Sequence, residues 1–258
     1  MMKVEDAIIL AGGLGTRMLP ASMYMPKETM PLVDTPILNH LIWEAAKAGV
    51  SRIHLVISQE KFNILEKFLI DKEFFDGDRK NGYGGYVYDG RWKQYAKKII
   101  KRYKLNNRSK ILHINSEKGF ILNDIQKQLP KIQVFGTESS EYAIKKTMAS
   151  VKSKIYLSEP TKLPFKNNYF DFVLAIGVIY ALNLTNAIKC LKEINRVSKK
   201  NSFINLGSYS TNKDLELFNK WSLLGVTLLK ENEWVKVLKH ANYKGDYYFT
   251  NSKSLGLK

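Results

Sequence analysis

The sequence predicts an α/β fold with a doubly wound, mostly parallel sheet. Along most of the chain, short apolar runs alternate with stretches in which apolar residues recur at helical spacing, for example Ile188, Leu191 and Ile194. Such alternation of strands and helices is typical of parallel sheets that carry helices on both faces. The chain has 258 residues, of which 45% are hydrophobic, and it can therefore bury a substantial core.

The predicted elements begin with a small N-terminal βαβ unit. A buried strand at 6–10 enters a glycine-rich turn, a helix follows at 36–48, and a second strand lies at 52–57. From residue 93 onward the alternation of strands and helices is regular. Strands are expected at 110–114, 132–136, 154–157, 172–176 and 202–206, and helices at 93–103, 118–129, 141–147 and 185–197.

The C-terminal end is expected to extend the sheet. Two short segments at 226–229 and 246–250, separated by a helix at 232–241, predict an antiparallel pair at one edge. The order of elements divides the chain into two units, residues 1–62 and residues 71–258.

The turn after the first strand combines closely spaced glycines with two cationic side chains. Gly12, Gly13 and Gly15 let backbone N–H groups approach an anion that a β-carbon would keep away. Arg17 and Lys27 add positive charge. This combination indicates a phosphate-binding turn, although a strand followed by a glycine-rich turn is also found at ordinary tight turns.

The N-terminal unit resembles the sugar-1-phosphate nucleotidyltransferases, most of all those of the UTP-glucose-1-phosphate uridylyltransferase type. The resemblance ends near Lys61 and rests on Leu10-Ala11-Gly12-Gly13, Gly15-Thr16-Arg17, Leu19-Pro20, Pro26-Lys27-Glu28 and Pro31-Leu32-Val33-Asp34. It implies that the glycines and Arg17 hold a nucleoside triphosphate with Mg²⁺ and that Lys27 meets phosphate. The family's metal-binding aspartates lie farther along a much longer domain and have no match here. We therefore expect no nucleotidyl transfer by this chain alone.

Aromatic residues and glycines are concentrated between residues 74 and 92. They form the segments Phe74-Phe75-Asp76-Gly77-Asp78-Arg79, Gly82-Tyr83-Gly84-Gly85-Tyr86 and Tyr88-Asp89-Gly90-Arg91-Trp92. This composition does not suit a regular helix, and it offers flat apolar faces beside polar groups. It predicts a lid or substrate loop, with a structural loop over the end of the sheet as the alternative.

The second unit resembles the class I S-adenosylmethionine-dependent methyltransferases. Besides the aromatic segments above, the matching elements are Gly136-Thr137-Glu138-Ser139-Ser140-Glu141-Tyr142-Ala143-Ile144, Leu163-Pro164-Phe165, Asn168-Tyr169-Phe170-Asp171, Lys192-Glu193-Ile194-Asn195-Arg196-Val197 and Gly245-Asp246-Tyr247-Tyr248. The resemblance implies a Rossmann-like fold and S-adenosylmethionine as cofactor. It also implies that Glu138 binds the ribose hydroxyls and that Glu159 faces the adenine amino group, both at carboxyl ends of strands.

The first cofactor motif departs from the family pattern Asp-x-Gly-x-Gly-x-Gly. The corresponding run contains His113, Asn115, Glu117 and Gly119, so only the last glycine is kept. In the family, backbone at the positions of Asn115 and Glu117 passes close to the cofactor, so their side chains would stand in the way. Glu117 also brings a negative charge near the carboxylate of the cofactor. The departure predicts weakened cofactor binding, by about 1 to 3 kcal/mol for each strained position.

Three hypotheses for function follow. The first is a methyltransferase-like enzyme that acts on a small molecule such as a sugar or glycan intermediate. Tyr180 is a weak candidate for its general base, because the high pKa of tyrosine makes it a poor base at neutral pH. The second is a non-catalytic or vestigial fusion protein in which both sites have decayed. The third is a nucleoside-triphosphate-binding protein related to the nucleotidyltransferases and completed by another chain.

Composition constrains partners and location. The net charge of +17 raises nucleic acid as a partner, but the Lys and Arg residues are spread over separate elements, which disfavours it. The only cysteine, Cys190, is expected in the core of a protein from a reducing compartment. The sequence contains no apolar run typical of a signal peptide or membrane span, so a cytoplasmic location is expected, and His40, His54 and His240 lack metal-ligand spacing. The sequence does not determine the oligomeric state.

Overall fold

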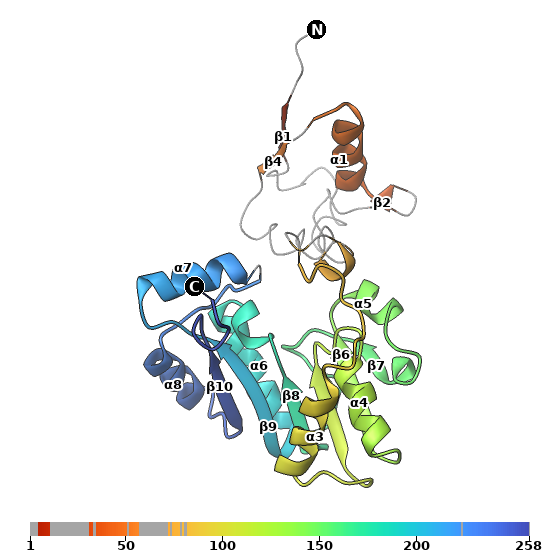
Figure 1. The fold of residues 1–258 in the computed structure, drawn as a ribbon, viewed down its shortest axis with the longest axis vertical. Coiled ribbons are helices and arrows are strands. Elements are labelled where there is room, and N and C mark those ends of the chain that lie inside the picture. Colours follow the sequence, from red (N-terminus) through yellow and green to blue (C-terminus); the bar gives the residue numbers. More distant parts are fainter. Residues whose placement is uncertain are drawn as a thin grey trace.

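The computed structural model describes residues 5–10, 31–32, 35–50, 52–56, 72, 74–77, 79, 82–222 and 224–257. A six-stranded sheet forms the centre of the larger part (Figure 1). Its order is β10-β9-β8-β5-β6-β7, and every pairing in it is parallel. The strands are β5 (Lys110–Ile114), β6 (Gln133–Glu138), β7 (Ile155–Leu157), β8 (Phe170–Ala175), β9 (Ser198–Gly207) and β10 (Asp246–Thr250).

The strand order reverses at the middle of the sheet. From β5 the chain moves outward to β6 and β7, then crosses back to β8 on the other side of β5 and continues to β9 and β10. In open parallel sheets, this reversal opens a crevice at the carboxyl ends of the two central strands, where ligands bind. The fold therefore places its natural ligand site at the ends of β5 and β8.

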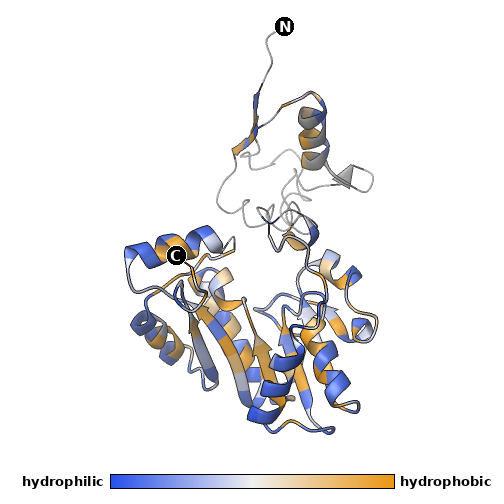
Figure 2. Cartoon of the chain, in the orientation of Figure 1, coloured by the Kyte–Doolittle hydropathy of each residue, from blue (hydrophilic) through white to orange (hydrophobic). Residues whose placement is uncertain are grey.

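Helices cover both faces of the sheet because the central strands are apolar on both faces. Successive side chains of a strand point to opposite faces. Ile111, Phe172 and Leu174 pack in a cluster with α3 (Lys93–Arg102) and α4 (Phe120–Gln128). Leu112 and Val173 pack in a second cluster with α6 (Leu184–Val197) and α8 (Glu231–His240). Figure 2 shows these strands as hydrophobic along most of their length.

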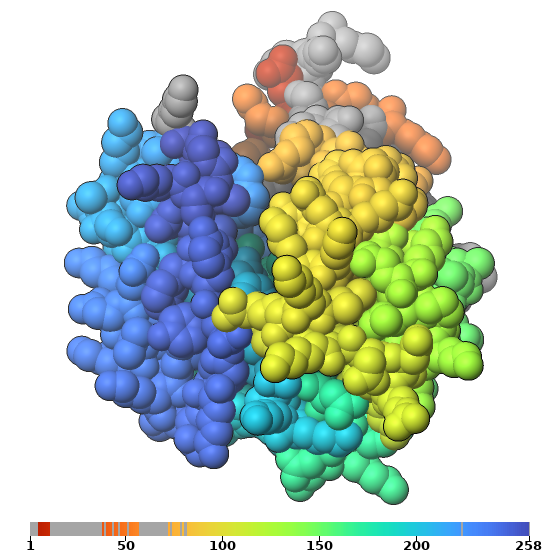
Figure 3. Space-filling view, turned by 60° about the horizontal axis from the view of Figure 1, so that its bottom comes forward, coloured from red at the N-terminus to blue at the C-terminus, as the bar shows by residue number. Residues whose placement is uncertain are grey.

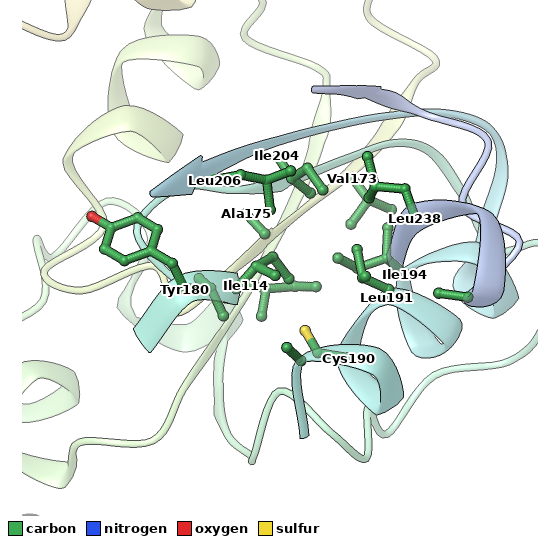
Figure 4. Packing of buried hydrophobic residues seen from close by; sticks show 14 of the residues in the cluster. Ile114, Val173, Ala175, Tyr180, Cys190, Leu191, Ile194, Ile204, Leu206 and Leu238 are labelled. Atoms are coloured by element: carbon green, nitrogen blue, oxygen red, sulfur yellow. The ribbon is translucent and has the colours of Figure 1, made fainter. Parts of the chain in front are cut away.

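The helix α6 shows how local sequence sets the layers. The Asn183 side chain accepts a hydrogen bond of 2.9 Å from the Asn186 N–H and so caps the helix. Cys190, Leu191 and Ile194 then face the sheet with no exposed surface (Figure 4). Burial raises the pKa of the Cys190 thiol.

The remaining described helices are short or lie at the edges. They are α5 (Glu141–Lys145), α7 (Asn212–Trp221), and the 3₁₀ helices η5 (Lys152–Lys154) and η6 (Ile179–Ala181). At the β10 edge of the sheet, the Asp246 carboxylate accepts a hydrogen bond of 2.9 Å from the Arg102 guanidinium and one of 2.8 Å from the Tyr103 hydroxyl. In Figure 3 the yellow segment that includes α3 accordingly lies against the blue C-terminal segment.

The N-terminal unit is a separate βαβ arrangement. Strands β1 (Asp6–Leu10) and β4 (Arg52–Val56) pair in parallel, with α1 (Ile37–Lys47) between them in sequence. The short strands β2 (Pro31–Leu32) and β3 (Thr35–Pro36) form an antiparallel pair. The Arg52 guanidinium donates two hydrogen bonds of 2.7 Å to Asp6, which fixes the register of β1 and β4, and it holds the pKa of that carboxyl at about 2.

The observed fold confirms the predicted α/β class, the mostly parallel sheet and the N-terminal βαβ unit. The predicted antiparallel pair is wrong. Strand β10 pairs with β9 in parallel, and the segment at 226–229 contributes only an isolated parallel bridge from Leu229 to Ser208. The reason is that α8 carries the chain back to the amino end of the sheet before β10 begins, as in any crossover connection.

The core clusters predict that the second unit folds without the first. Both clusters are drawn from Ala96 onward, and none of their members lies in the described part of the N-terminal unit. A chain that begins at Asp71 should therefore unfold in one cooperative transition, measured by circular dichroism and tryptophan fluorescence during urea titration. Two transitions or a loss of cooperativity in the shortened chain would contradict this prediction.

Candidate functional site

A cavity of about 420 Å³ opens where the strand order reverses. The carboxyl ends of four strands contribute to its lining. Asn115 and Glu117 follow β5, Glu138 is the last residue of β6, Glu159 follows β7 and Gly177 follows β8. The volume is within the range of sites for small molecules and cofactors. The cavity therefore lies where the topology predicts a ligand.

The turn after β5 has an unusual backbone. Asn115, Glu117 and Gly119 have φ values of 48°, 53° and 76°, all in the left-handed region. These are the three positions at which the methyltransferase-like motif expects glycine. Asparagine tolerates this conformation, whereas glutamate adopts it at a cost of roughly 1 to 2 kcal/mol. The turn thus has the backbone of a glycine-rich turn, with asparagine and glutamate at two of its left-handed positions.

Gly119 and His113 lie outside the cavity lining. Gly119 precedes α4, and a Cβ there would lie 2.8 Å from Cγ2 of Val151, so this position requires glycine for packing as well as for φ. His113 is 6% exposed on β5, and neither ring nitrogen has a hydrogen-bond partner within the described part of the chain. Burial lowers the pKa of His113 to about 3, so the ring is neutral at physiological pH.

The Glu138 carboxylate connects the turns after β5 and β6. It accepts hydrogen bonds from the backbone N–H groups of Glu117 at 2.7 Å, Ser139 at 2.8 Å and Ser140 at 2.9 Å. Two of these donors share Oε1, so Oε2 keeps a lone pair for a further donor such as a ribose hydroxyl. Burial raises the pKa of Glu138 to about 7, and these N–H donors only partly offset that effect.

The aromatic segment packs onto the turn after β5. The Tyr83 hydroxyl donates to the Glu117 carboxylate, and Tyr86 makes a second hydrogen bond to it. The Tyr83 and Tyr86 rings lie 4.4 Å apart, and Tyr86 stacks on Phe120 of α4 at 4.8 Å. Phe74, Phe75 and Tyr83 are also part of the cavity wall. The segment thus covers the end of the sheet and lines the cavity at the same time.

An ion pair anchors this segment. The Lys118 ammonium pairs with the Asp76 carboxylate and donates to the Tyr86 carbonyl at 2.8 Å. The Tyr142 hydroxyl donates to the same carboxylate at 2.7 Å. Burial tends to raise the pKa of Asp76, but its bonds to Lys118 and Tyr142 outweigh burial and lower it. The ionised Asp76 therefore holds the segment against α5 and the turn after β5.

Two other predicted residues differ in their relation to the cavity. Glu159 follows β7, is exposed and lines the cavity. Tyr180 is 7% exposed outside the lining, and burial raises its pKa to about 12, which disfavours a role as base. Figure 4 shows its hydroxyl at one end of the apolar cluster, directed away from the other labelled residues. Its carbonyl accepts from the N–H groups of Val226 and Thr227, both at 2.9 Å, and so positions the wall that contains Val226.

Much of the apolar wall was not predicted from sequence. It comes from the segment between β8 and α6 and from the segment after α7. Its apolar residues are Ile176, Val178, Ala181, Leu182, Leu224 and Val226, and the start of α6 adds the polar Asn183 and Asn186. Gly177, directly after a predicted strand, gave a usable signal for the first of these regions. The segment after α7 gave none, because only the tertiary fold brings it to the cavity.

The predicted nucleotide-binding residues Gly12, Gly13, Gly15, Arg17 and Lys27 lie outside the residues that the structure describes. Within the described ranges, no group of three or more His, Cys, Asp or Glu side chains is arranged to hold a metal ion. Each of the described helices is too short or too polar to span a membrane.

Comparison with known families agrees with both resemblances. Residues 6–79 match the family model described as nucleotidyl transferase, and residues 112–206 match the model described as methyltransferase domain. The resemblance of the first unit to nucleotidyltransferases and of the second to methyltransferases is therefore confirmed.

The similar curated proteins are much longer than the region they share with this chain. UTP-glucose-1-phosphate uridylyltransferases of Staphylococcus epidermidis and Mycoplasma genitalium are 45% and 42% identical to it over 73 and 69 residues. These regions make up 28% and 27% of this chain, and 25% and 24% of the relatives. The chain thus spans about a quarter of the length of the curated relatives that it matches.

Solved structures are similar to part of this chain at low sequence identity. A candidate methyltransferase from Bacillus halodurans has a TM-score of 0.47 and 16% identity, covering 57% of this chain and 68% of that one. YcgJ from Bacillus subtilis has a TM-score of 0.48 and 14% identity, covering 57% and 67%. The [4+2]-cyclase SpnF has a TM-score of 0.47 and 14% identity, covering 58% and 57%.

The buried Glu138 predicts a pH-dependent stability. Its pKa rises from 4.5 to about 7 on folding, so the native state keeps a proton that the unfolded chain has already lost. Stability should therefore fall as pH rises from 4.5 to about 7, by roughly 3 kcal/mol from this group at 1.36 kcal/mol per pKa unit. Urea unfolding across this window should show a shallower decline for Glu138→Gln than for the wild type. The control Glu141→Gln, at a side chain with 68% exposure, should match the wild type.

Equal slopes for wild type and Glu138→Gln would show that this carboxylate is ionised at the same pH in both states.

Proposed function

We propose that residues 71–258 bind the adenosyl group of S-adenosylmethionine and transfer a methyl group to a small molecule. The observation that carries the proposal is the left-handed backbone at Asn115 and Glu117 in the cavity wall, where the Glu138 carboxylate accepts from the Glu117 N–H. At Asn115 and Glu117 this conformation costs free energy, because neither residue is glycine. Strained backbone positions of this kind cluster at ligand-binding sites.

The nucleoside half of the cofactor fits the residues present. Glu138 would accept from the ribose hydroxyls through the free lone pair of Oε2, and Glu159 would accept from the adenine amino group. The amino-acid half would fit poorly, because Glu117 lines the cavity and its carboxylate would repel the carboxylate of methionine. Cofactor binding is therefore weaker than in a site with glycines at these positions.

The bound cofactor would supply a methyl group on a reactive sulfonium, so the protein mainly has to align the acceptor and exclude water. The wall formed by Val178, Leu182, Leu224 and Val226 is apolar, and Asn183 adds a polar group at its edge. An acceptor with an apolar face and a few hydroxyl groups suits this lining. A sugar or glycan intermediate is our preferred class, because the same chain carries a segment similar to enzymes named for glucose 1-phosphate.

A non-catalytic role is the second candidate. It is favoured by one specific observation, the hydrogen bond from Tyr83 to Glu117, which fixes a carboxylate in the space that a glycine would leave open. In that case the cavity would bind an adenosine-like ligand without methyl transfer, and the protein would act as a binding module of the cytoplasm.

The N-terminal unit is expected to be inactive as a transferase. The shared region covers about a quarter of the related uridylyltransferases and leaves out the rest of their chain. The full chain with UTP or dTTP, Mg²⁺ and glucose 1-phosphate should release no more pyrophosphate than a protein-free control, in a coupled phosphate assay. Pyrophosphate release that Arg17→Ala abolishes would show an active nucleotidyltransferase instead.

The adenosyl site is tested by calorimetric titration with S-adenosylmethionine. Glu159→Gln should weaken binding about tenfold, equivalent to about 1.4 kcal/mol, because it replaces the acceptor that faces adenine. Glu141→Gln changes the same charge on an exposed side chain outside the cavity and should leave affinity unchanged. Binding that neither substitution alters would place the ligand elsewhere.

A further inference from the structure

The cavity has an acidic lining. Among the described residues that line it, Glu117, Glu138 and Glu159 carry carboxylates, and no lysine, arginine or histidine is present. This contrasts with the net charge of +17 of the whole chain. An anionic group of a ligand would therefore meet no cation in this part of the wall.

The order of the strands gives the direction in which a nucleoside lies. Across the carboxyl edge of the sheet the order is β7, β6, β5 and β8, which places Glu159, Glu138, Glu117 and Gly177 in that sequence. If Glu159 faces the base and Glu138 the ribose, the next position along the edge receives the substituent at the 5′ carbon. That position is the turn with Asn115 and Glu117.

The substituent at the 5′ carbon therefore meets a carboxylate held in place. Two hydroxyl groups, those of Tyr83 and Tyr86, bond to Glu117, and its own backbone N–H is bound to Glu138 at 2.7 Å. The Oδ1 atom of Asn115, in the same turn, is buried without a hydrogen-bond partner in the described part of the chain. The Glu117 carboxylate is thus an acceptor fixed in the cavity wall, and a donor such as an ammonium group would bond to it.

We propose that this cavity selects adenosines whose 5′ substituent is cationic and lacks a carboxylate. The inference rests on the proposed function, since it assumes that the adenosyl group binds along the strand ends. A sulfonium or ammonium group would be attracted by Glu117 and Glu138, while the carboxylate of methionine would be repelled at the same place. S-adenosylmethionine carries all three groups, so its affinity is a compromise between attraction and repulsion.

The test compares three ligands by calorimetry at low salt and at one pH above 7, where Glu138 with its pKa of about 7 is ionised. Decarboxylated S-adenosylmethionine keeps both cations and lacks the carboxylate, S-adenosylmethionine has all three charges, and 5′-methylthioadenosine is uncharged at the 5′ end. The wild type should bind decarboxylated S-adenosylmethionine at least about tenfold more tightly than either of the other two ligands. Added salt should reduce this preference. Equal affinities for the first two ligands would overturn the inference.

Two variants test the negative charge of Glu117. In Glu117→Gln, the ratio of affinities for the decarboxylated ligand and 5′-methylthioadenosine should fall about tenfold, whereas the control Glu141→Gln should keep the wild-type ratio. In Tyr83→Phe, loss of a donor that lowers the pKa of Glu117 favours the protonated carboxyl, so the ratio should also fall, by less than in Glu117→Gln. Tyr83→Phe also provides the answer if Glu117→Gln does not fold, as judged by its thermal melting curve.

The outcomes separate this inference from the proposed function. If none of the three ligands binds to the wild type, the adenosyl site itself is wrong. If 5′-methylthioadenosine binds and the cationic ligand has no advantage, the adenosyl site stands and the charge selectivity is wrong. A preference that Glu117→Gln leaves intact would also overturn the selectivity, because another group would then cause it.

Discussion

Three backbone N–H groups converge on the carboxylate of Glu138, and the geometry of the cavity depends on this convergence. The bond from Glu117 ties the turn after β5 to the end of β6, while those from Ser139 and Ser140 order the turn that leads into α5. Burial works against the ionised form strongly enough to raise the pKa of Glu138 to about 7. The same side chain therefore organises the site and lowers the stability of the fold as the pH rises toward 7. A ligand hydroxyl that donates to Oε2 would favour the ionised form of Glu138.

The turn after β5 is where local preference and tertiary structure disagree. Asparagine and glutamate occupy left-handed positions, which their side chains disfavour to different degrees, and the surrounding contacts impose the conformation. Gly119 shows the ordinary case beside them, since both its φ of 76° and the nearby Val151 exclude a Cβ. Conflicts of this kind are expected at functional sites, where ligand binding and not packing selects the backbone. A former site that has lost its ligand would show the same pattern until further substitutions relax it.

The central elements could be predicted from the sequence because their pattern is decided locally. The run at 110–114 is an apolar strand buried on both faces, and the structure assigns β5 to the same residues. Strand β9 begins at Ser198, four residues before the predicted start. Its first residues are polar, and only their pairing with the distant strand β8 makes them part of the sheet. The parallel direction of β10 and the cavity wall at Leu224 depend on how distant segments meet. The positions of the acidic residues were predictable from a motif, whereas the hydrogen bond from Tyr83 was not.

The single cysteine, Cys190, has no exposed surface and lies between α6 and the sheet, next to Leu191. A buried thiol with a raised pKa reacts with an alkylating reagent only when the layer around it opens. Because the chain has no other cysteine, the rate of alkylation reports on that one opening without any labelling mutation. At high reagent concentration, where reaction is faster than reclosing, the alkylation rate equals the rate at which the core opens. At low concentration it is proportional to the fraction of molecules that are open. Each chain thus carries its own reporter for the lifetime of its packed core.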